Sequence, residues 1–368
     1  MTSRKLHIDI TPRTFHFKQP ARTSRGVYTT RRSWFVTVTL SGVEGEPLSY
    51  ALSGECAPLP DLSCDAVPHY ETTLRDLCKL IEHTGQLPYD LLRPYPSMLF
   101  GLETAFLCAF HSLPSPVQEE FLSQPFCKGE EGIPINGLVW MGTHDEMLQR
   151  IEEKTKAGFR CIKLKIGAID FEQELDLIRH IRQRYSPEQI ELRLDANGAF
   201  SPDEALKRLE QLAPYTIHSI EQPIKQGQWK EMNRICRLSP IPIALDEELI
   251  GINLTVMKEA LLDEIQPAYI ILKPSLHGGM HGTQEWIQLA RKRNIDSWIT
   301  SALESNVGLD AIACLAAHLY GPHISMPQGL GTGQLFTDNI PLPLTIHGDM
   351  LWRRTAESFS FGGAESLF

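Results

Sequence analysis

Residues 162–167 read IKLKIG, a short run in which aliphatic residues and lysines alternate. Side chains along a β-strand point alternately to its two faces, so Lys163 and Lys165 share one face and the aliphatic residues share the other. Two lysines that point into a protein interior are costly unless they are paired or functional. We therefore expect a strand whose apolar face packs on helices and whose polar face lines an interior.

Runs of the same kind recur from about residue 135, in alternation with longer amphipathic segments. Short apolar runs predict strands, and the longer segments predict helices. One helix has a clear start, with Ser201 as N-cap, Pro202 at the first position, and Asp203 and Glu204 in the first turn. The expected strands are 135–141, 161–166, 190–195, 217–221, 241–246, 268–273, 296–301 and 323–326, and the expected helices are 144–157, 172–184, 202–213, 228–238, 253–263, 281–293 and 307–319.

This alternation predicts an α/β fold of the (β/α)₈ type, because eight strands separated by helices suit a closed barrel. A six-stranded, doubly wound sheet is the alternative architecture. It is disfavoured because no glycine-rich fingerprint follows the first strand. We expect the barrel to occupy residues 131–337.

The first 130 residues lack this rhythm and predict a small α+β capping domain. Runs at 6–10, 34–40 and 48–52 alternate or are apolar and predict an antiparallel meander. Helices are expected at 70–84 and 97–112, the second with Ser97 as its N-cap. We expect the tail, residues 338–368, to pack back on this domain.

Composition excludes several classes of protein. The formal net charge is −10 over 368 residues and no basic cluster stands out, which argues against a nucleic-acid partner. No apolar run approaches the length of a membrane span, and residues 1–10 lack the apolar core of a signal peptide. The eight cysteines form no CxxC pair. We expect a cytoplasmic protein with reduced thiols. A homo-oligomer is compatible with the sequence.

In a barrel of this type the active site forms where the strands end. The third, fourth and fifth strands end at Asp195, Glu221 and Asp246, and the strands to either side end at Lys165 and Lys273. The successive gaps from Asp195 to Lys273 are 26, 25 and 27 residues, each one strand–helix unit. Three neighbouring strands are therefore expected to deliver three carboxylates at one level, flanked by two lysines.

Three converging carboxylates repel one another unless a cation lies between them. An all-oxygen ligand set suits Mg²⁺ and also accepts Mn²⁺. Lys165 and Lys273 would face each other across the metal, where a nearby cation and partial burial lower the pKa of a lysine toward that of a general base. The pattern predicts removal of a proton α to a carboxylate that the metal holds.

Each of these residues could also have a purely structural role. A single aspartate at a strand end is more often a helix N-cap, and a single buried lysine is more often a structural ion pair. Five ionisable groups on five successive strands, in the order Lys, Asp, Glu, Asp, Lys, favour a functional site. A non-catalytic scaffold would be expected to have lost one of them. A metal-dependent hydrolase would show His-x-His on the first strand, where residues 136–140 read NGLVW.

At these motifs the chain resembles the enolase superfamily over nearly its whole length. The similar stretches are KLK at 163–165, DAN at 195–197, EQP at 221–223, DE at 246–247 and KP at 273–274. The resemblance implies a modified (β/α)₇β barrel with an N-terminal α+β capping domain. It also implies Mg²⁺ on the three carboxylates and two lysines beside the substrate.

Two branches of that superfamily fit poorly. Mandelate-racemase-like members carry a histidine on the seventh strand, and residues 298–305 contain none. Dipeptide epimerases carry an Asp-x-Asp on the eighth strand, and residues 326–333 contain no acid. The runs ILKPSLHGG at 271–279, SALES at 301–305 and GLGT at 329–332 instead resemble the o-succinylbenzoate synthase family, in the muconate-lactonizing-enzyme-like subgroup.

That resemblance implies a Mg²⁺-dependent dehydration in menaquinone biosynthesis, from 2-succinyl-6-hydroxy-2,4-cyclohexadiene-1-carboxylate to 2-succinylbenzoate. Lys165 would remove the proton and assist loss of the hydroxyl, and Lys273 would stabilise the enediolate. Racemisation of N-succinylamino acids by the same two lysines is the alternative that the motifs leave open. Residues 23–32 resemble a mobile capping loop of some members. Loop arginines such as Arg22, Arg25, Arg31 and Arg32 are more often solvated than substrate-binding. The expected substrate contacts are Lys163, Arg193, Asn197, Thr300, Ser301 and Gly329.

Overall fold

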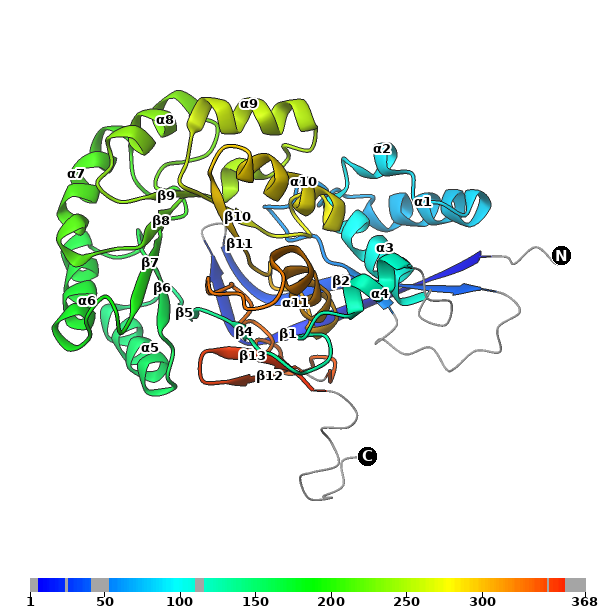
Figure 1. Ribbon diagram of the computed structural model, residues 1–368, viewed down its shortest axis with the longest axis horizontal. Helices are drawn as coiled ribbons and strands as arrows, with labels where there is room; N and C mark the ends of the chain where they lie inside the picture. The colour runs from blue at the N-terminus through cyan, green and yellow to red at the C-terminus, as the bar shows by residue number, and fades with distance from the viewer. Residues whose placement is uncertain (1–5, 24–25, 41–52, 110–115, 343, 355–368) are drawn as a thin grey trace, which may run out of the picture.

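The computed structural model describes residues 6–23, 26–40, 53–109, 116–342 and 344–354. Figure 1 shows a curved sheet surrounded on its outside by helices, with the N-terminal strands and helices beside it. No helix in the described ranges is both long and apolar enough to cross a bilayer. The strand expected at 48–52 and the last residues of the helix expected at 97–112 lie outside the described residues.

The N-terminal sheet is an antiparallel meander in the order β1-β2-β3, comprising β1 (Leu6–Thr23), β2 (Gly26–Leu40) and β3 (Ser53–Cys56). β1 and β2 are longer than expected, and their register shifts between His16 and Ala21. β1 also contains Pro12 and Pro20, and an edge strand tolerates proline because one side of its backbone needs no partner. The meander was therefore predicted correctly in kind but not in length.

Four helices follow the meander: α1 (Tyr70–Thr84), α2 (Tyr89–Leu92), α3 (Pro96–Ala109) and α4 (Pro116–Leu122). The prediction of Ser97 as an N-cap is wrong, because α3 already begins at Pro96. The backbone N–H and the hydroxyl of Ser97 both donate to Asp65 Oδ2, at 2.8 and 2.6 Å. The acceptor at this helix start comes from 32 residues earlier in the chain, a distance that a local capping pattern cannot reveal.

The second part of the chain is a parallel sheet in the order β11-β10-β9-β8-β7-β6-β5, with one helix after each strand. The strands are β5 (Gly137–Val139), β6 (Cys161–Lys165), β7 (Glu191–Asp195), β8 (Ser219–Glu221), β9 (Ile243–Leu245), β10 (Tyr269–Leu272) and β11 (Asp296–Ile299). The helices are α5 (His144–Lys156), α6 (Phe171–Arg184), α7 (Pro202–Leu212), α8 (Trp229–Leu238), α9 (Thr255–Ile265), α10 (Gly279–Arg291) and α11 (Asn306–Tyr320), with 3₁₀ turns η3 (Ala213–Tyr215) and η4 (Glu247–Leu249).

The sheet is closed by single bridges in place of a full eighth strand. Gln328 bridges to Ile135 and Gly329 bridges to Thr300, both in the parallel sense. Gly329 N–H donates to Ile299 O at 2.8 Å, which ties this segment to β11. The strand expected at 323–326 is therefore wrong, and the closing position falls a few residues later. The fold is a capped barrel of the (β/α)₇β kind, as the resemblance implied.

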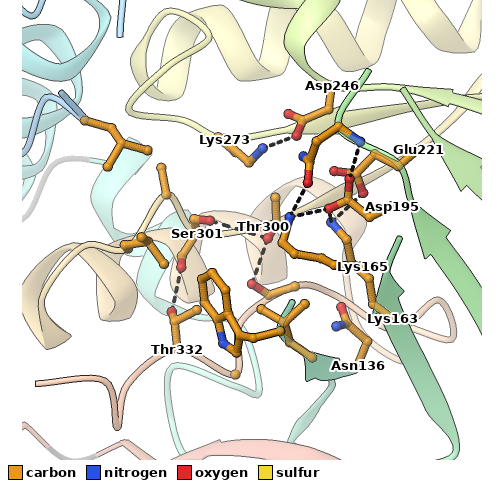
Figure 2. Close-up of a pocket in the computed structure, with 18 of the residues that line it drawn as sticks. Asn136, Lys163, Lys165, Asp195, Glu221, Asp246, Lys273, Thr300, Ser301 and Thr332 are labelled. Carbon is orange, nitrogen blue, oxygen red and sulfur yellow. Dashed lines mark hydrogen bonds and ion pairs between the residues drawn. The ribbon is translucent and has the colours of Figure 1, made fainter. Parts of the chain in front are cut away.

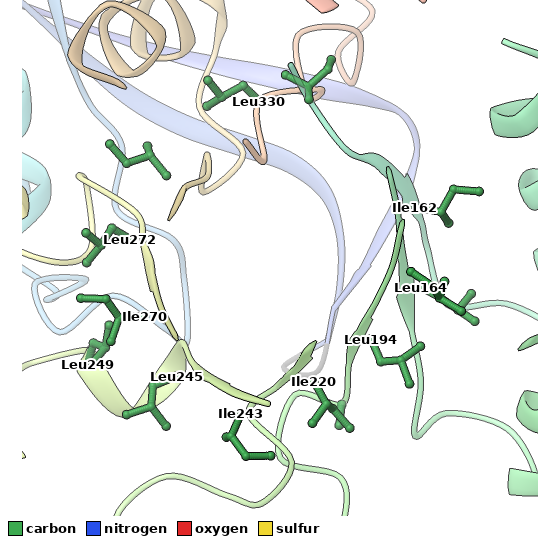
Figure 3. Close-up of a cluster of buried hydrophobic side chains, with 14 of the residues drawn as sticks. Ile162, Leu164, Leu194, Ile220, Ile243, Leu245, Leu249, Ile270, Leu272 and Leu330 are labelled. Carbon is green, nitrogen blue, oxygen red and sulfur yellow. The ribbon is translucent and has the colours of Figure 1, made fainter. Parts of the chain in front are cut away.

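The predicted side-chain directions on strand β6 are confirmed. Ile162 and Leu164 are fully buried and point toward the surrounding helices, whereas Lys163 and Lys165 line the interior pocket. Aliphatic residues of the neighbouring strands form the same outer layer in Figure 3, and burying each such side chain contributes about 2 kcal/mol. This apolar layer fixes which strand residues face inward. The residues drawn there include Leu194, Ile220, Ile243, Leu245, Ile270 and Leu272.

The C-terminal tail contacts both parts of the molecule. Asp338 accepts a hydrogen bond from His16 N–H of β1 at 2.8 Å. Farther on, β12 (Leu344–His347) and β13 (Met350–Arg353) form a hairpin that pairs with β4 (Ile133–Pro134), directly before the barrel. The division at residues 130 and 337 stays a proposal.

Candidate active site

A pocket opens where the parallel strands end (Figure 2). Its wall on the barrel side carries the five ionisable groups singled out in the sequence. Tyr28, Leu59 and Leu62 of the N-terminal part complete the wall from the other side. The remaining lining residues are Asn136, Leu138, Trp140, Lys163, Asn197, Glu247, Trp298, Thr300, Ser301, Ala302, Leu303, Gly329, Gly331 and Thr332.

Strand register brings the first three groups to one level. Lys165 is paired with Asp195 across β6 and β7, and Asp195 is paired with Glu221 across β7 and β8. The Nζ of Lys165 lies 2.7 Å from Asp195 Oδ2, and the Nζ of Lys163 lies 3.0 Å from the same oxygen. Lys163 Nζ also lies 2.5 Å from Glu221 Oε2. On the far side of this row, Lys273 forms an ion pair with Asp246.

Burial and neighbouring charges act in opposite directions on these groups. Burial alone would raise the pKa of Asp195, but Lys163 and Lys165 outweigh it and hold the pKa below its usual value. Burial and the negative charge of Asp195 raise the pKa of Glu221 well above its usual value. Of the three carboxyl groups of the row, Glu221 is therefore the one whose charged form the surroundings favour least.

The second ion pair is balanced more closely. Burial would raise the pKa of Asp246, but Lys273 outweighs it and lowers the pKa. Burial would lower the pKa of Lys273, but Asp246 and then Glu221 raise it. Burial and Asp246 raise the pKa of Glu247. Both members of the Asp246–Lys273 pair are thus held in their charged forms.

Two carboxylate oxygens fit a divalent cation. Glu221 Oε1 and Asp246 Oδ1 are buried and make no hydrogen bond within the described residues. Asp195 Oδ1 accepts from Asn197 N–H at 3.2 Å, and the other oxygens of the carboxylate row are held by the three lysines. In this arrangement no three acidic, histidine or cysteine side chains of the described ranges converge closely enough to hold an ion. An all-carboxylate set with two unpaired oxygens suits a hard cation such as Mg²⁺. Its arrival would compensate the charge on Glu221.

Asn197 connects Lys165 to a carboxylate that the sequence argument missed. The Nζ of Lys165 donates to Asn197 Oδ1 at 2.7 Å, and Asn197 Nδ2 donates to Glu247 Oε1 at 2.9 Å. Asn197 has a φ of 44°, in the left-handed region that asparagine tolerates better than most residues. Both polar groups of this amide are therefore engaged within the protein. Glu247 directly follows Asp246, but its inward direction could not be read from strand parity because it lies in η4.

Small residues form the wall that closes the barrel. Thr300 Oγ1 donates to Gly329 O at 2.9 Å, and the hydroxyls of Ser301 and Thr332 lie 2.5 Å apart. A Cβ at position 329 would lie 2.1 Å from Thr300 Oγ1, so only glycine allows this approach. All three predicted residues of this wall, Thr300, Ser301 and Gly329, do line the pocket.

Arg193 is not placed at the pocket, contrary to the expected substrate contact. It lies on β7 two residues before Asp195, and its guanidinium stacks 4.3 Å from the Trp298 ring centroid. Its Nε donates to Glu191 Oε1 at 2.7 Å and its Nη1 to Pro327 O at 2.9 Å. Arg193 is in register with Lys163, which does line the pocket, but its guanidinium is engaged by Trp298, Glu191 and Pro327 and is not among the pocket lining.

The arginines of the segment expected to act as a capping loop serve structural contacts where they are described. Arg31 is buried and its Nη2 donates to Ala57 O at 2.6 Å. Arg32 is exposed and pairs with Glu71. The side chains of Arg22 and Arg25 lie outside the described residues. The seven cysteines whose side chains are described are free thiols.

Known proteins share this architecture. A family model described as "Enolase C-terminal domain-like" matches residues 146–349. An o-succinylbenzoate synthase of Desulfotalea psychrophila is 44% identical over 91% of this chain and 95% of its own length. The crystal structure of MenC from the same organism matches with a TM-score of 0.77 at 40% identity, covering 95% of this chain and 99% of that one.

More distant structures share the fold. A dipeptide epimerase from Cytophaga hutchinsonii matches with a TM-score of 0.78 at 20% identity, over 95% of this chain and 92% of that one. At that identity the likeness concerns architecture alone. The family model and the high identity to a full-length relative are decisive: the chain belongs to the enolase superfamily and, within it, to the o-succinylbenzoate synthase family.

Proposed function

We propose that this lyase dehydrates 2-succinyl-6-hydroxy-2,4-cyclohexadiene-1-carboxylate to 2-succinylbenzoate in menaquinone biosynthesis. One observation carries the proposal: lysines at the ends of β6 and β10 flank a row of three carboxylates at the ends of β7, β8 and β9. A base beside a cation site is the equipment for removing a proton next to a carboxylate. The 44% identical relative carries the name of this activity.

Members of the enolase superfamily generally bind Mg²⁺. In this chain Asp195, Glu221 and Asp246 would hold Mg²⁺, or Mn²⁺ in its place, and the unpaired oxygens of Glu221 and Asp246 support that assignment. When bound, the metal supplies positive charge to the substrate carboxylate and to the enediolate that forms from it. Lys163, wedged between two of these carboxylates, would then be released toward the same substrate group.

Lys165 is the proposed base. Its Nζ is held by Asp195 and Asn197, which fix the direction of its free electron pair when it is neutral. The amine takes the proton next to the ring carboxylate, and the electron pair of that C–H bond passes into the enediolate. As the 6-hydroxyl leaves, the electrons form the new ring double bond, and the ammonium of Lys165 returns its proton to the departing oxygen as water.

Lys273 would stay protonated throughout. Its ion pair with Asp246, which raises the pKa of Lys273, keeps a positive charge on the opposite side of the substrate ring. That charge stabilises the enediolate electrostatically. Asn197, Thr300, Ser301 and Gly329 are the remaining proposed contacts, with the paired hydroxyls of Ser301 and Thr332 available to the succinyl tail. Arg193 is left out of this set because its guanidinium is engaged by Trp298, Glu191 and Pro327 and does not line the pocket.

Racemisation of N-succinylamino acids is the second candidate, since a lysine stands on each side of the pocket. In that reaction one lysine removes the α-proton and the other returns a proton to the opposite face. We propose that either reaction takes place in the cytoplasm on a small-molecule carboxylate; a homo-oligomer is compatible with both.

The two reactions are separated by one pair of assays. Purified protein with Mg²⁺ is given the cyclohexadiene carboxylate, and loss of its absorbance is followed. The same protein is given an N-succinylamino acid in D₂O, and α-deuterium is followed by NMR. Fast dehydration supports the synthase. An inert cyclohexadiene carboxylate with rapid deuterium incorporation would replace it with the racemase.

A further inference from the structure

Three charged side chains lie buried behind the pocket and take no part in the proposed chemistry. Arg31 comes from β2, Glu55 from β3 and Glu304 from the loop between β11 and α11. Arg31 is 2% exposed, and both carboxylates are fully buried. Buried charges of this kind are costly unless they are compensated, so their retention calls for an explanation.

Glu55 connects the N-terminal sheet to the start of α11. Its carboxylate accepts hydrogen bonds from Ser305 N–H at 3.0 Å, from Ser305 Oγ at 2.6 Å and from Gly308 N–H at 2.9 Å. Ser33 Oγ donates to its other oxygen at 2.7 Å. A carboxylate at a helix N-terminus meets both free N–H groups and the positive end of the helix dipole. Glu55 therefore holds the loop that leads into α11.

Glu304 connects two pocket loops to each other. One carboxylate oxygen accepts from Ala302 N–H at 2.6 Å, within the loop that carries Thr300 and Ser301. The other forms a short hydrogen bond with Ser275 Oγ, two residues after Lys273. A single side chain outside the pocket thus joins the wall around Ala302 to the segment that carries Lys273.

Arg31 supplies the opposite charge. Burial lowers the pKa of Arg31, and Glu304 and Glu55 are the two strongest influences that oppose this. Reciprocally, burial raises the pKa of Glu304 and Arg31 is the strongest influence that lowers it. Within the described ranges Arg31 Nε and Nη1 make no hydrogen bond, so Arg31 acts here mainly as a charge.

Backbone strain sits beside this cluster. Leu303 has a φ of 66°, in a region that costs a leucine about 1–2 kcal/mol. It lies between Ala302 and Glu304 and lines the pocket. Such a conformation persists only when its surroundings fix it. The hydrogen bonds of Glu304 and Ser305 on its C-terminal side provide that restraint.

We propose that Glu304 is a positioning residue: through Ser275 and Ala302 it fixes the Lys273 loop and the Leu303 wall relative to each other, with Arg31 as its counter-charge from the N-terminal sheet. The proposal rests on the proposed role of Lys273. Glu304 does not touch the pocket contents. Its effect passes through the placement of Lys273, whose backbone N–H is itself held by His277 Nδ1 at 2.9 Å.

The first test measures loop placement without relying on turnover. Amide hydrogen exchange is compared by mass spectrometry in the wild type, Glu304→Ala and Ser275→Ala. Both variants should speed exchange in peptides covering 272–278, and Glu304→Ala should also speed it at 300–305. Unchanged exchange in 272–278 in a folded Glu304→Ala protein would overturn the proposal, whatever reaction the enzyme catalyses.

The matched control is Glu103→Gln. Glu103 is another buried carboxylate from the N-terminal part; it accepts from Met280 N–H and His281 N–H at the start of α10 and is not among the residues that line the pocket. Its variant should leave exchange at 300–305 unchanged. If it speeds exchange there as strongly as Glu304→Ala, general loosening between the two parts of the chain would explain the effect, and the proposal would fail.

The second test uses kinetics. Glu304→Ala and Ser275→Ala should each lower kcat about tenfold or more with little change in KM, and the double variant should be no worse than the poorer single one, since both break one connection. Glu304→Gln should recover most of the kcat, because the amide can still form hydrogen bonds with Ser275 and Ala302. Glu304→Gln should lower the thermal stability, because Arg31 loses a counter-charge, and adding Arg31→Met should restore it. Additive losses, or a normal kcat in Glu304→Ala, would contradict the proposal. An inactive wild type would instead contradict the proposed function.

Discussion

Lys165 Nζ donates a hydrogen bond to Asn197 Oδ1 at 2.7 Å, and the other end of this amide is held by Glu247 at 2.9 Å. An amide clamped at its nitrogen must present its oxygen to the lysine. The ammonium is therefore held from two directions, by Asn197 and by Asp195. This assigns Asn197 the task of aiming Lys165, in addition to any contact with the substrate.

Replacing Asn197 by leucine tests this task. The variant keeps a side chain of similar size but loses both hydrogen bonds, so kcat should fall about 10- to 100-fold while KM changes less. Asn233→Leu is the matched control, because Asn233 donates to Glu264 O and Ile265 O, and neither residue lines the pocket. A raised KM with an unchanged kcat in Asn197→Leu would mean that Asn197 binds substrate without aiming the base.

Two substitutions of Leu303 test its contact with the substrate. Leu303→Gly removes the strain of a left-handed leucine and also removes the apolar wall; Leu303→Asn tolerates the same backbone but presents a polar group. We expect both variants to raise KM about tenfold, which corresponds to about 1.4 kcal/mol of lost contact. Steady-state kinetics and thermal unfolding measure the two effects. Unchanged KM in both would show that Leu303 does not contact the substrate.

Metal binding should stabilise the protein. Because Glu221 Oε1 and Asp246 Oδ1 are buried without hydrogen bonds, Mg²⁺ at about 100 times its Kd should add about 2.7 kcal/mol to the free energy of unfolding. Glu221→Gln should abolish this gain. Glu248→Gln, a neighbouring buried acid that accepts from Gly227 N–H away from the pocket, should retain it. Equal stabilisation of both variants by Mg²⁺ would place the metal elsewhere.

Glu103 predicts a pH dependence of stability. Burial raises its pKa to about 8 in the folded state, above the usual value of 4.5. The folded state binds this proton more tightly, so the contribution is fully present below the unfolded pKa and is lost as pH rises through about 8. One unit of pKa difference corresponds to about 1.4 kcal/mol.

Glu103→Gln cannot titrate, so the free energy of unfolding of the wild type should fall relative to this variant between pH 5 and pH 9. Urea unfolding at several pH values measures the difference. Glu210→Gln, an exposed acid on α7, is the control and should run parallel to the wild type. Parallel curves for Glu103→Gln as well would show that Glu103 does not titrate in this range.

Strand parity and spacing predicted the central part of this structure. Side-chain direction on a strand is fixed by its period of two, so Lys163 and Lys165 could be assigned to the interior from the sequence. Asp195, Glu221 and Asp246 are evenly spaced because one strand–helix unit separates each from the next. These are local regularities, and a single sequence contains them.

The errors concern relations between distant segments. The strand expected at 323–326 is displaced because closure depends on bridges to Ile135 and Thr300, which no local pattern encodes. The local pattern at Ser97 predicts a cap, but Ser97 donates to Asp65, which lies 32 residues earlier in the chain. Arg193 is in register with the pocket residue Lys163, but its guanidinium is engaged by Trp298, Glu191 and Pro327, and strand parity does not encode these partners.

The role of Lys165 as the base is tested by the turnover of a variant that lacks this lysine. Turnover of the cyclohexadiene carboxylate is followed with Mg²⁺ for the wild type and for Lys165→Ala, after Mg²⁺-dependent stabilisation has shown that the variant still binds the metal. We expect rapid turnover by the wild type and a loss of about 1000-fold or more in Lys165→Ala, since the whole base is removed. Turnover by Lys165→Ala within about tenfold of the wild type would contradict this role.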